Sequence, residues 1–215
     1  IPDKYTDRGK WMDGWESRRK RTPGHDWAII KLGAQGKIKG FDIDTNHFLG
    51  NHPPFVSVEA IYLKNDHIYW SKADELDWEE ILPKSPLNPG SQHFFEIDSK
   101  KVYTHVRLHI YPDGGVARFR VYGEVFKDWN HVNPDEIIDL ALVNNCGKAI
   151  HCNDIFFSDM ANLISPTKGK NMGDGWETKR NRTPDNVDFV ILRLGHSGLV
   201  QKIIVDTKHF KGNSM

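Results

Sequence analysis

The feature that most constrains this chain is an internal repeat. Residues 13–23 read DGWESRRKRTP and residues 174–184 read DGWETKRNRTP, an offset of 161. After one inserted residue the match resumes at an offset of 162, and 19 positions between residues 13 and 51 are identical in the two copies. This period is much longer than that of solenoid repeats, so the sequence indicates a duplicated domain.

The repeat also sets the domain boundaries that we expect. A polar stretch at residues 128–134 separates the copies, so we predict a first repeat at residues 1–127 and a second at residues 135–215. Two copies at this period need roughly 320 residues, whereas the chain has 215. We therefore expect a fragment. The first copy would lack one or two N-terminal strands, and the second would hold only its N-terminal half.

The composition is typical of a soluble globular protein, with 38% hydrophobic and 27% charged residues. The 29 basic residues balance 29 acidic ones, so the basic excess of proteins that bind nucleic acid or anionic membranes is missing. No apolar run reaches the ~18 residues of a membrane-spanning helix. Two cysteines, Cys146 and Cys152, make neither a disulfide framework nor a metal-binding pair, which favours a reducing intracellular compartment. We expect the cytoplasm, with the peroxisome as the alternative.

Strand patterns dominate the chain. Segments with period-two alternation or runs of β-branched and aromatic residues lie at 27–32, 37–44, 55–63, 102–110 and 119–123. Only two short helices are predicted, at residues 74–81 and 158–163. Many short strands in a unit of this size predict an all-β fold, namely an antiparallel β-sandwich of the jelly-roll, galactose-binding-like kind, duplicated and with its second copy truncated.

One face of these strands is expected to form the core. The residues expected to be buried are Trp27, Val56, Val58, Val106, Leu108 and Phe119. The segment at residues 111–115, Tyr-Pro-Asp-Gly-Gly, predicts a tight turn that joins the last two strands. Its glycines can adopt positive φ at low cost.

The loop DGWESRRKRTP concentrates charge just before a predicted strand. Arg19 and Arg21 could bind a carboxylate in bidentate geometry. Trp15, between a glycine and a glutamate, could form the wall of a pocket. The alternative is structural: the arginines would pair with Asp13 and Glu16 and hold the loop in shape.

A second candidate loop, DTNHFLGNH, follows the strand at residues 37–44. Asp44 or His47 could act as a general base, because histidine titrates near neutral pH. Asp44, His47 and His52 could instead ligate a divalent metal, although their spacing matches no firm template. In the structural alternative, a histidine at the end of a strand is simply hydrogen-bonded.

The third candidate is the segment DGGVARFR at residues 113–120, whose structural alternative is a hairpin turn with arginines on its exposed face. Motifs that would indicate other chemistry are absent from the sequence: it has no P-loop, no G-x-G-x-x-G, no G-x-S-x-G and no H-E-x-x-H. Neither cysteine has the context of a catalytic nucleophile.

These motifs together resemble those of a known family. The doubled GWE-x-[RK]-R-x-RTP motif, the DTxHFxGN motif and YPDGGVARFRVYG strongly resemble the allantoicase (allantoate amidinohydrolase) family over essentially the whole chain. The resemblance implies two similar jelly-roll domains in one chain and assembly into homo-oligomers. It also implies a hydrolase of linear amidines, which converts allantoate to (S)-ureidoglycolate and urea in purine (allantoin) degradation.

The implied substrate assigns roles to the residues above. Allantoate carries a carboxylate on a carbon that bears two ureido groups, and urea leaves when a carbon–nitrogen bond breaks. The candidates for binding the carboxylate are Arg19, Arg21 and Arg118. The candidates for proton transfer are Glu16, Asp44 and His47. Trp15, Asn51 and Asp113 complete the substrate-binding set, with Asn51 hydrogen-bonding the ureido groups.

We expect the three candidate loops to gather at one end of the sandwich. The residues that would then line one pocket are Glu16, Arg19, Asp44, His47 and Arg118. No metal ligands and no cofactor are assigned, and a divalent metal stays open. The alternative function is a non-catalytic ligand- or carbohydrate-binding β-sandwich, or an inactive relative of the enzyme. We expect allantoate as the substrate, and neither nucleic acid nor a membrane as a partner.

Overall fold

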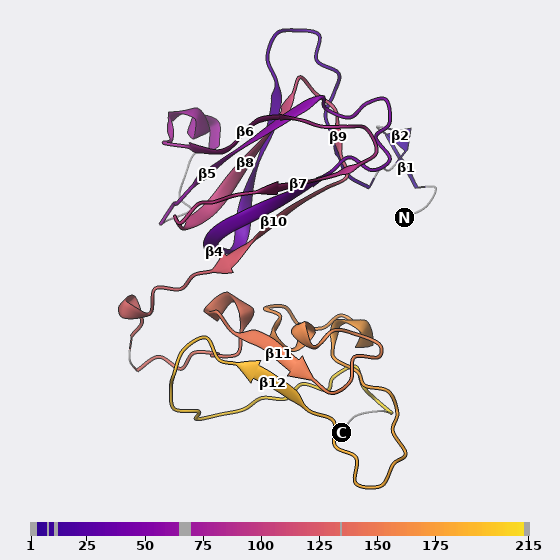
Figure 1. Cartoon of the computed structure of the whole chain (residues 1–215), viewed down its shortest axis with the longest axis vertical. Helices are drawn as coiled ribbons and strands as arrows, with labels where there is room; N and C mark the ends of the chain where they lie inside the picture. The colour runs from indigo at the N-terminus through magenta and orange to yellow at the C-terminus, as the bar shows by residue number, and fades with distance from the viewer. Residues whose placement is uncertain (1–3, 8, 11–12, 65–69, 134, 213–215) are drawn as a thin grey trace. The chain divides into compact units, whose positions relative to one another are not determined.

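The computed structural model describes residues 4–7, 9–10, 13–64, 70–133 and 135–212. The chain divides into two compact units, residues 1–124 and 125–215 (Figure 1). Antiparallel strands and short 3-10 helices make up the regular structure of the described residues. The all-β, antiparallel prediction is therefore confirmed.

The first unit is built around one branched antiparallel sheet. Its strands run in the order β10-β4-β8-β5-β6, and β7 also pairs with β4. Their bounds are Asp26–Asp44 for β4, Phe55–Ile61 for β5, Glu79–Pro86 for β6, Gln92–Glu96 for β7, Tyr103–Tyr111 for β8 and Arg118–Val125 for β10. Two further pairs join β1 (Tyr5–Thr6) to β2 (Gly9–Lys10) and β3 (Trp15–Glu16) to β9 (Gly115–Val116).

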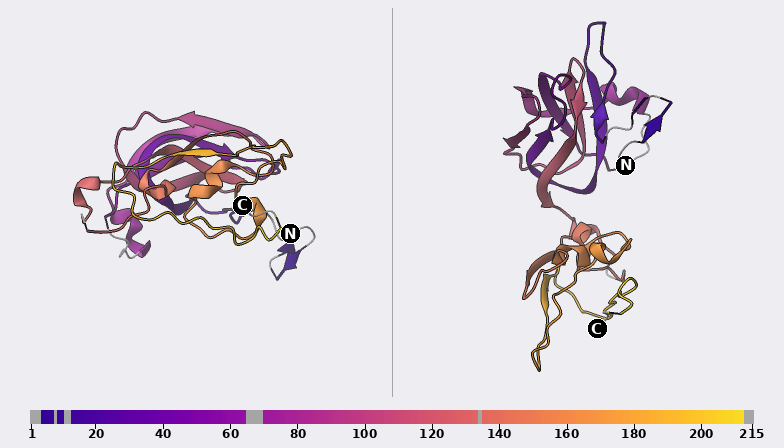
Figure 2. Two further views of the ribbon diagram at one scale, coloured as in Figure 1. Left: turned by 90° about the horizontal axis from the view of Figure 1, so that it is seen from below. Right: turned by 90° about the vertical axis from the view of Figure 1, so that its right-hand side faces the viewer.

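Strand β4 connects the two layers of this unit. Its first half pairs with β8, and its second half pairs with β7 from Gly40 to Asp44. The β4–β8 register shifts between Lys31 and Gly36. The segments predicted at residues 27–32 and 37–44 are thus two halves of one 19-residue strand. The shift at this glycine-containing stretch lets β4 leave the layer of β8, β5 and β6 and join that of β7 and β10 (Figures 1 and 2).

The core lies between these layers. Alternate residues of β5 and β8 point into it, and Val56, Val58, Val106 and Leu108 are at most 2% exposed, as predicted. Phe119 is only partly buried: it packs against the core, and its ring stacks on that of Phe41 with the centroids 5.4 Å apart.

Trp27 is not a core residue, and its predicted burial was wrong. It pairs with His109 across β4 and β8, which places it on the polar face of that sheet, and it is 41% exposed. The Arg107 guanidinium lies over its ring, 5.8 Å from the centroid. An aromatic ring that receives a cation in this way is stabilised outside the core.

The predicted helix at residues 74–81 was also wrong. A 3-10 helix, η1, spans Trp70–Glu75, and the chain is already in β6 at Glu79. Pairing with β5 decides this outcome, because Glu79 lies opposite Ala60 and Leu82 opposite Val58. The helix expected at residues 158–163 is present as a shorter 3-10 helix, η4, at Met160–Ile164.

The segment at residues 111–115 does not join two neighbouring strands, because β4 lies between β8 and β10. Instead it leads into β9, which pairs with β3. Gly114 has a φ of +139°, and a Cβ at this position would lie 2.6–2.8 Å from the backbone of residues 51–53. Glycine is therefore required here, but by the approach of another loop rather than by a hairpin.

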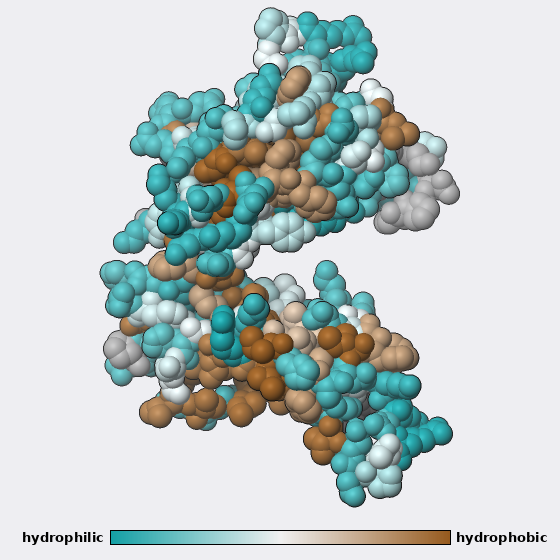
Figure 3. Space-filling view, viewed as in Figure 1, coloured by the Kyte–Doolittle hydropathy of each residue, from teal (hydrophilic) through white to brown (hydrophobic). Residues whose placement is uncertain are grey.

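In the described part of the second unit, β11 (Lys148–Cys152) and β12 (Val190–Arg193) form a two-stranded sheet. Its 3-10 helices are η2 (Trp129–His131), η3 (Val143–Asn145), η4 and η5 (Met172–Asp174). Many of its apolar side chains are exposed, as the brown areas of Figure 3 show. Leu199 is 90% exposed and Ile203 is 79% exposed. Among the helices of the described residues, none has the length and apolarity to cross a membrane.

Candidate functional site

The three candidate loops of the first unit meet in one place, which we call the loop junction (residues 13–17, 44–51 and 113–118). Backbone hydrogen bonds hold it together. The amide of Gly115 donates to the Asn51 carbonyl at 2.8 Å, and the amide of Ala117 donates to the Asp44 carbonyl at 2.7 Å. The pairing of β3 with β9 adds the loop that contains Trp15. Segments far apart in sequence are thus fixed side by side.

Phe48 anchors the loop junction. Its side chain is 3% exposed and lies against two glycines. A Cβ on Gly115 would lie 1.9 Å from the ring, and one on Gly14 would lie 3.1 Å from it. The glycines of the DGWE and PDGG motifs therefore leave room for the phenylalanine of the HFLG motif, which explains why these motifs occur together.

Two polar pairs cross the loop junction. The side-chain amide of Asn51 donates to Glu16 Oε1 at 2.5 Å, and an Arg118 nitrogen lies 2.6 Å from the Asp13 carboxylate. The hydrogen bond and positive charge of Arg118 lower the pKa of Asp13, and the same pair raises the pKa of Arg118. Asp13 is therefore paired with Arg118 rather than with Arg19 or Arg21, the partners considered in the structural alternative.

Asp44 and His47 occupy different environments in the same turn. Asp44 is 7% exposed, and its Oδ1 accepts a hydrogen bond from the backbone N–H of Asn46 at 2.8 Å. His47 is exposed and has a φ of +72°, a conformation that non-glycine residues seldom adopt. The buried carboxylate thus shapes the turn, and the turn presents the imidazole to solvent.

The described residues contain no group of three or more His, Cys, Asp or Glu side chains arranged to hold a metal ion. Asp44, His47 and His52, which the sequence offered as an alternative metal site, do not form one.

Beside β3 lies an open hollow lined by cations, which we call the cationic hollow. Its lining residues are Trp15, Ser17, Arg18, Arg19, Lys20, Arg21, Thr22, His25, Asp26 and Trp27. Lys20 is neutralised by Asp26 at 2.7 Å, and its amide donates to Asp113 Oδ2, also at 2.7 Å. Arg19 and Arg21 are exposed and have no ion-pair partner within the described part of the chain. Both remain able to bind an anion.

The structure therefore divides the predicted site residues between two places. Trp15, Arg19 and Arg21 line the cationic hollow, and Asp113 supports its wall through the Lys20 amide. The residues at the loop junction are Glu16, Asp44, His47, Asn51 and Arg118, and none of them lines the hollow. The two places adjoin at β3, which contributes Trp15 to the hollow and Glu16 to the loop junction.

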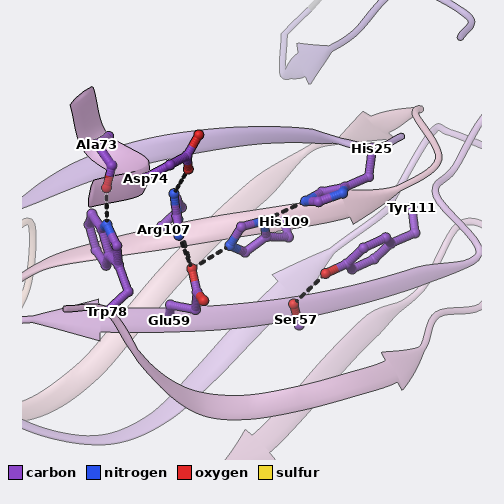
Figure 4. Close-up of polar contacts among 9 residues, drawn as sticks. All are labelled: His25, Ser57, Glu59, Ala73, Asp74, Trp78, Arg107, His109 and Tyr111. Atoms are coloured by element: carbon purple, nitrogen blue, oxygen red, sulfur yellow. Dashed lines mark hydrogen bonds and ion pairs between the residues drawn. The ribbon is translucent and has the colours of Figure 1, made fainter. Parts of the chain in front are cut away.

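One network was not anticipated from the sequence (Figure 4). His25 Nε2 lies 2.8 Å from His109 Nδ1, and His109 Nε2 lies 2.8 Å from Glu59 Oε2. Arg107 binds the same carboxylate oxygen through its Nε at 2.7 Å and reaches Asp74 with another nitrogen. A signal was present: every second residue from His105 to Tyr111 is polar or aromatic, which is unusual for a strand face that is buried.

Two groups of this network have shifted pKa values. Burial lowers the pKa of His25, and the positive charge of a protonated His109 lowers it further; together they outweigh the opposing effect of Asp26. Burial raises the pKa of Glu59, but hydrogen bonds from His109 and Arg107 outweigh burial and leave it lowered. Glu59 is therefore ionised and His25 neutral near neutral pH.

The lowered pKa of His25 predicts a pH-dependent stability. Protonation is less favourable in the folded state than in the unfolded chain, so the stabilisation is present above the unfolded pKa of 6.5 and is lost as the pH falls below it. We expect the melting temperature to fall between about pH 7.5 and about pH 5.5, and His25→Gln to reduce that fall. Calorimetry across this range checks it, and an unchanged pH dependence in the variant would contradict the prediction.

Comparisons with known proteins agree with these motifs. The family model described as the allantoicase repeat matches residues 1–126 and 138–215. Curated proteins named "Probable allantoicase" are 53% identical over 97% of this chain in Pseudomonas fluorescens Pf-5 and 51% identical over 98% in Photobacterium profundum. The chain spans 62% of the length of each.

Solved structures agree as well. A structure of allantoicase has a TM-score of 0.70 and 43% identity, and covers 87% of this chain and 57% of its own. Allantoicase from Saccharomyces cerevisiae has a TM-score of 0.69 and 40% identity, over 91% of this chain and 59% of its own. With both copies of the repeat matched by the family model, this chain belongs to the allantoicase family.

Proposed function

We propose that the protein containing this chain hydrolyses allantoate to (S)-ureidoglycolate and urea, a step of purine (allantoin) degradation. Membership of the allantoicase family and the names of its relatives support this activity. The cationic hollow is the observation that assigns this activity to particular residues. There Arg19 and Arg21 are exposed and have no ion-pair partner within the described part of the chain, and Trp15 lies beside them. Such a surface suits a small, polar carboxylate.

The reaction requires two proton transfers. The bond between the central carbon and one ureido nitrogen breaks, and that nitrogen takes up a proton as urea leaves. A water oxygen bonds to the carbon and gives up a proton, so the overall reaction consumes one water and leaves the protein unchanged. The site must therefore supply an acid, a base and a cation for the carboxylate.

We propose that Arg19 and Arg21 bind the carboxylate and that Trp15 forms the wall beside it. The exposed Glu16 and His47 are the proposed proton-transfer groups of the loop junction. Asp44, which the sequence also suggested for proton transfer, is better suited to positioning His47, because it is buried and hydrogen-bonded to the turn.

The remaining members of the proposed site act at its edges. Asn51 presents an amide that can hydrogen-bond a ureido group, and it is held by Glu16. Arg118 can attract the substrate carboxylate only by leaving Asp13, so its contribution is weaker than that of an unpaired arginine. Asp113 fixes the backbone at Lys20.

Urea release from allantoate by the purified full-length protein tests the proposed activity. Production of urea and ureidoglycolate in equal amounts is the expected result. The alternative of a non-catalytic ligand-binding β-sandwich predicts that allantoate or a carbohydrate binds, measured by calorimetry, without any release of urea.

Replacing Arg19 by alanine should mainly weaken substrate binding. Losing one charge-assisted contact costs about 1.5–3 kcal/mol, which corresponds to a rise in KM of roughly 10- to 150-fold. Steady-state kinetics with allantoate measures it. The matched control is Arg180→Ala, the equivalent position in the second repeat, which should leave KM within about threefold of the parent value if the first repeat carries the site.

We also propose a homo-oligomeric protein that works in the cytoplasm, with the peroxisome as the alternative. Membership of the allantoicase family supports the oligomeric proposal, because the resemblance implies assembly into homo-oligomers. Light scattering of the full-length protein should give a mass that is a multiple of one chain.

A further inference from the structure

His25 is the residue of the cationic hollow that is best equipped for proton transfer. It lines the hollow together with Arg19 and Arg21. Its Nε2 is the end of a hydrogen-bonded chain that runs through His109 to Glu59 (Figure 4). We propose that His25 is the catalytic base that activates water in the hollow, and that His109 and Glu59 are its positioning residues. This assignment rests on the proposed function and adds a residue to it.

The direction of the hydrogen bonds follows from the ionised Glu59. As a carboxylate, Glu59 can only accept, so His109 donates to it from Nε2, at 2.8 Å. When the His109 ring is neutral, its Nδ1 carries a lone pair and accepts the Nε2 proton of His25, also at 2.8 Å. The lone pair of His25 is consequently left on Nδ1. No hydrogen bond to Nδ1 occurs among the described residues, so this nitrogen can take a proton.

The surroundings keep this arrangement rigid. Arg107 holds Glu59 from β8, and His109 is 7% exposed, so neither group of the chain rotates freely. The His25 ring also lies against Tyr111, with the centroids 4.5 Å apart. A base whose ring is oriented by a second group is the arrangement by which enzymes fix the tautomer of a catalytic histidine.

The charges that face His25 favour the neutral, basic form. Lys20 and Arg107 disfavour a positive charge on the ring, as a proton on His109 would, and among these groups only Asp26 favours one. Arg18, Arg19 and Arg21 of the hollow have the same sign as the first three. His25 is therefore ready to accept a proton at neutral pH, whereas a strongly raised pKa would have blocked it.

The proposed step balances with water alone. His25 Nδ1 takes a proton as the water oxygen bonds to the central carbon, and the carbon–nitrogen bond electrons move to the departing ureido nitrogen. That nitrogen is protonated from the loop junction side, and the proton on His25 then returns through solvent to the group that donated it. No oxidant, metal or cofactor is consumed.

The second repeat lacks this histidine. Continuing the 162-residue offset back from Trp27 and Phe189 places Val187 at the position of His25. Val187 is 73% exposed and cannot transfer a proton. The inference therefore assigns the base to the first repeat only.

The experiment compares variants of the full-length protein with allantoate as substrate. His25→Gln should lower kcat at least about 100-fold with little change in KM, and should abolish the limb of the pH profile on which activity falls with decreasing pH. Added imidazole should restore part of the activity of His25→Ala. His109→Gln should lower kcat less, about tenfold, and alter the pKa of that limb. His131→Gln, an exposed histidine of the second unit, is the control and should behave as the parent.

The outcomes separate the two proposals. An inactive parent protein would overturn the proposed function and this assignment with it. An active parent whose His25→Gln variant folds normally, keeps near-normal kcat and keeps the acidic limb would overturn His25 alone. A variant that loses activity but melts at a much lower temperature, and is not rescued by imidazole as His25→Ala, would show a structural role and also overturn it.

Discussion

Phe48→Ala is expected to lower the free energy of unfolding by about 3–5 kcal/mol, the cost typical of removing a buried phenylalanine. The ring is 3% exposed and fills the space above Gly14 and Gly115. Removing it leaves a cavity where the three loops of the junction meet, and the loops can collapse only by breaking their backbone hydrogen bonds. Denaturant unfolding of the parent and variant measures the difference.

Leu49→Ala is the matched control, because the neighbouring side chain is 73% exposed. Its effect should stay within about 0.5 kcal/mol. Gly115→Ala should destabilise in the same direction as Phe48→Ala, since the added methyl group would overlap the ring. If Phe48→Ala cost no more than Leu49→Ala, the ring would not be the anchor of the junction.

Much of the fold could be predicted from the sequence, because it depends on local alternation. Val56 and Val58 on one strand, and Val106 and Leu108 on another, show the period of two that a half-buried strand produces, and both strands are present. The edge strand β6 could not be predicted in this way. Residues 79–86 become a strand through pairing with β5, a contact that leaves no pattern in their own sequence.

Trp27 shows a second limit of predicting burial from the sequence pattern. Alternation with apolar neighbours indicates which residues share a face, but it does not say which face is covered by the other layer. The polar face of β8 is itself buried, at His105, Arg107 and His109, so burial and hydrophobicity do not coincide on this strand. A charge network can cover a sheet face when each member is paired, as Arg107 is with Glu59.

The candidate site could be predicted only in part, because the sequence shows the motifs at strand ends but not the pairing of distant strands. Motifs at strand ends predicted that three loops meet, and Phe48 with its two glycines explains the meeting. The chain from His25 to Glu59 could not be predicted. His25, Glu59 and His109 are separated by 34 and 50 residues, and only the register of β5 with β8 brings the last two together.

Replacing Glu16 by glutamine and His47 by asparagine together should lower turnover by about 100- to 10,000-fold with little change in KM. Both substitutions conserve the geometry. Glutamine can still accept the hydrogen bond from Asn51, and asparagine tolerates the positive φ of position 47 better than most residues. Loss of turnover in a folded protein would then report the proton transfer itself. The control is the equivalent double variant of the second repeat, Glu177→Gln with His209→Asn, which should retain parental turnover.

A purely structural role of Glu16 and His47 predicts a different result for the double variant. If Glu16 and His47 only hold the loop junction together, the double variant should melt at a lower temperature, and kcat and KM should change without a pattern. Near-normal turnover in a double variant with parental melting temperature would contradict the assignment of both residues. The acid would then have to come from Asp44, the remaining carboxyl of the same turn. Asp44→Asn would lower turnover in that case, while Glu16→Gln would not.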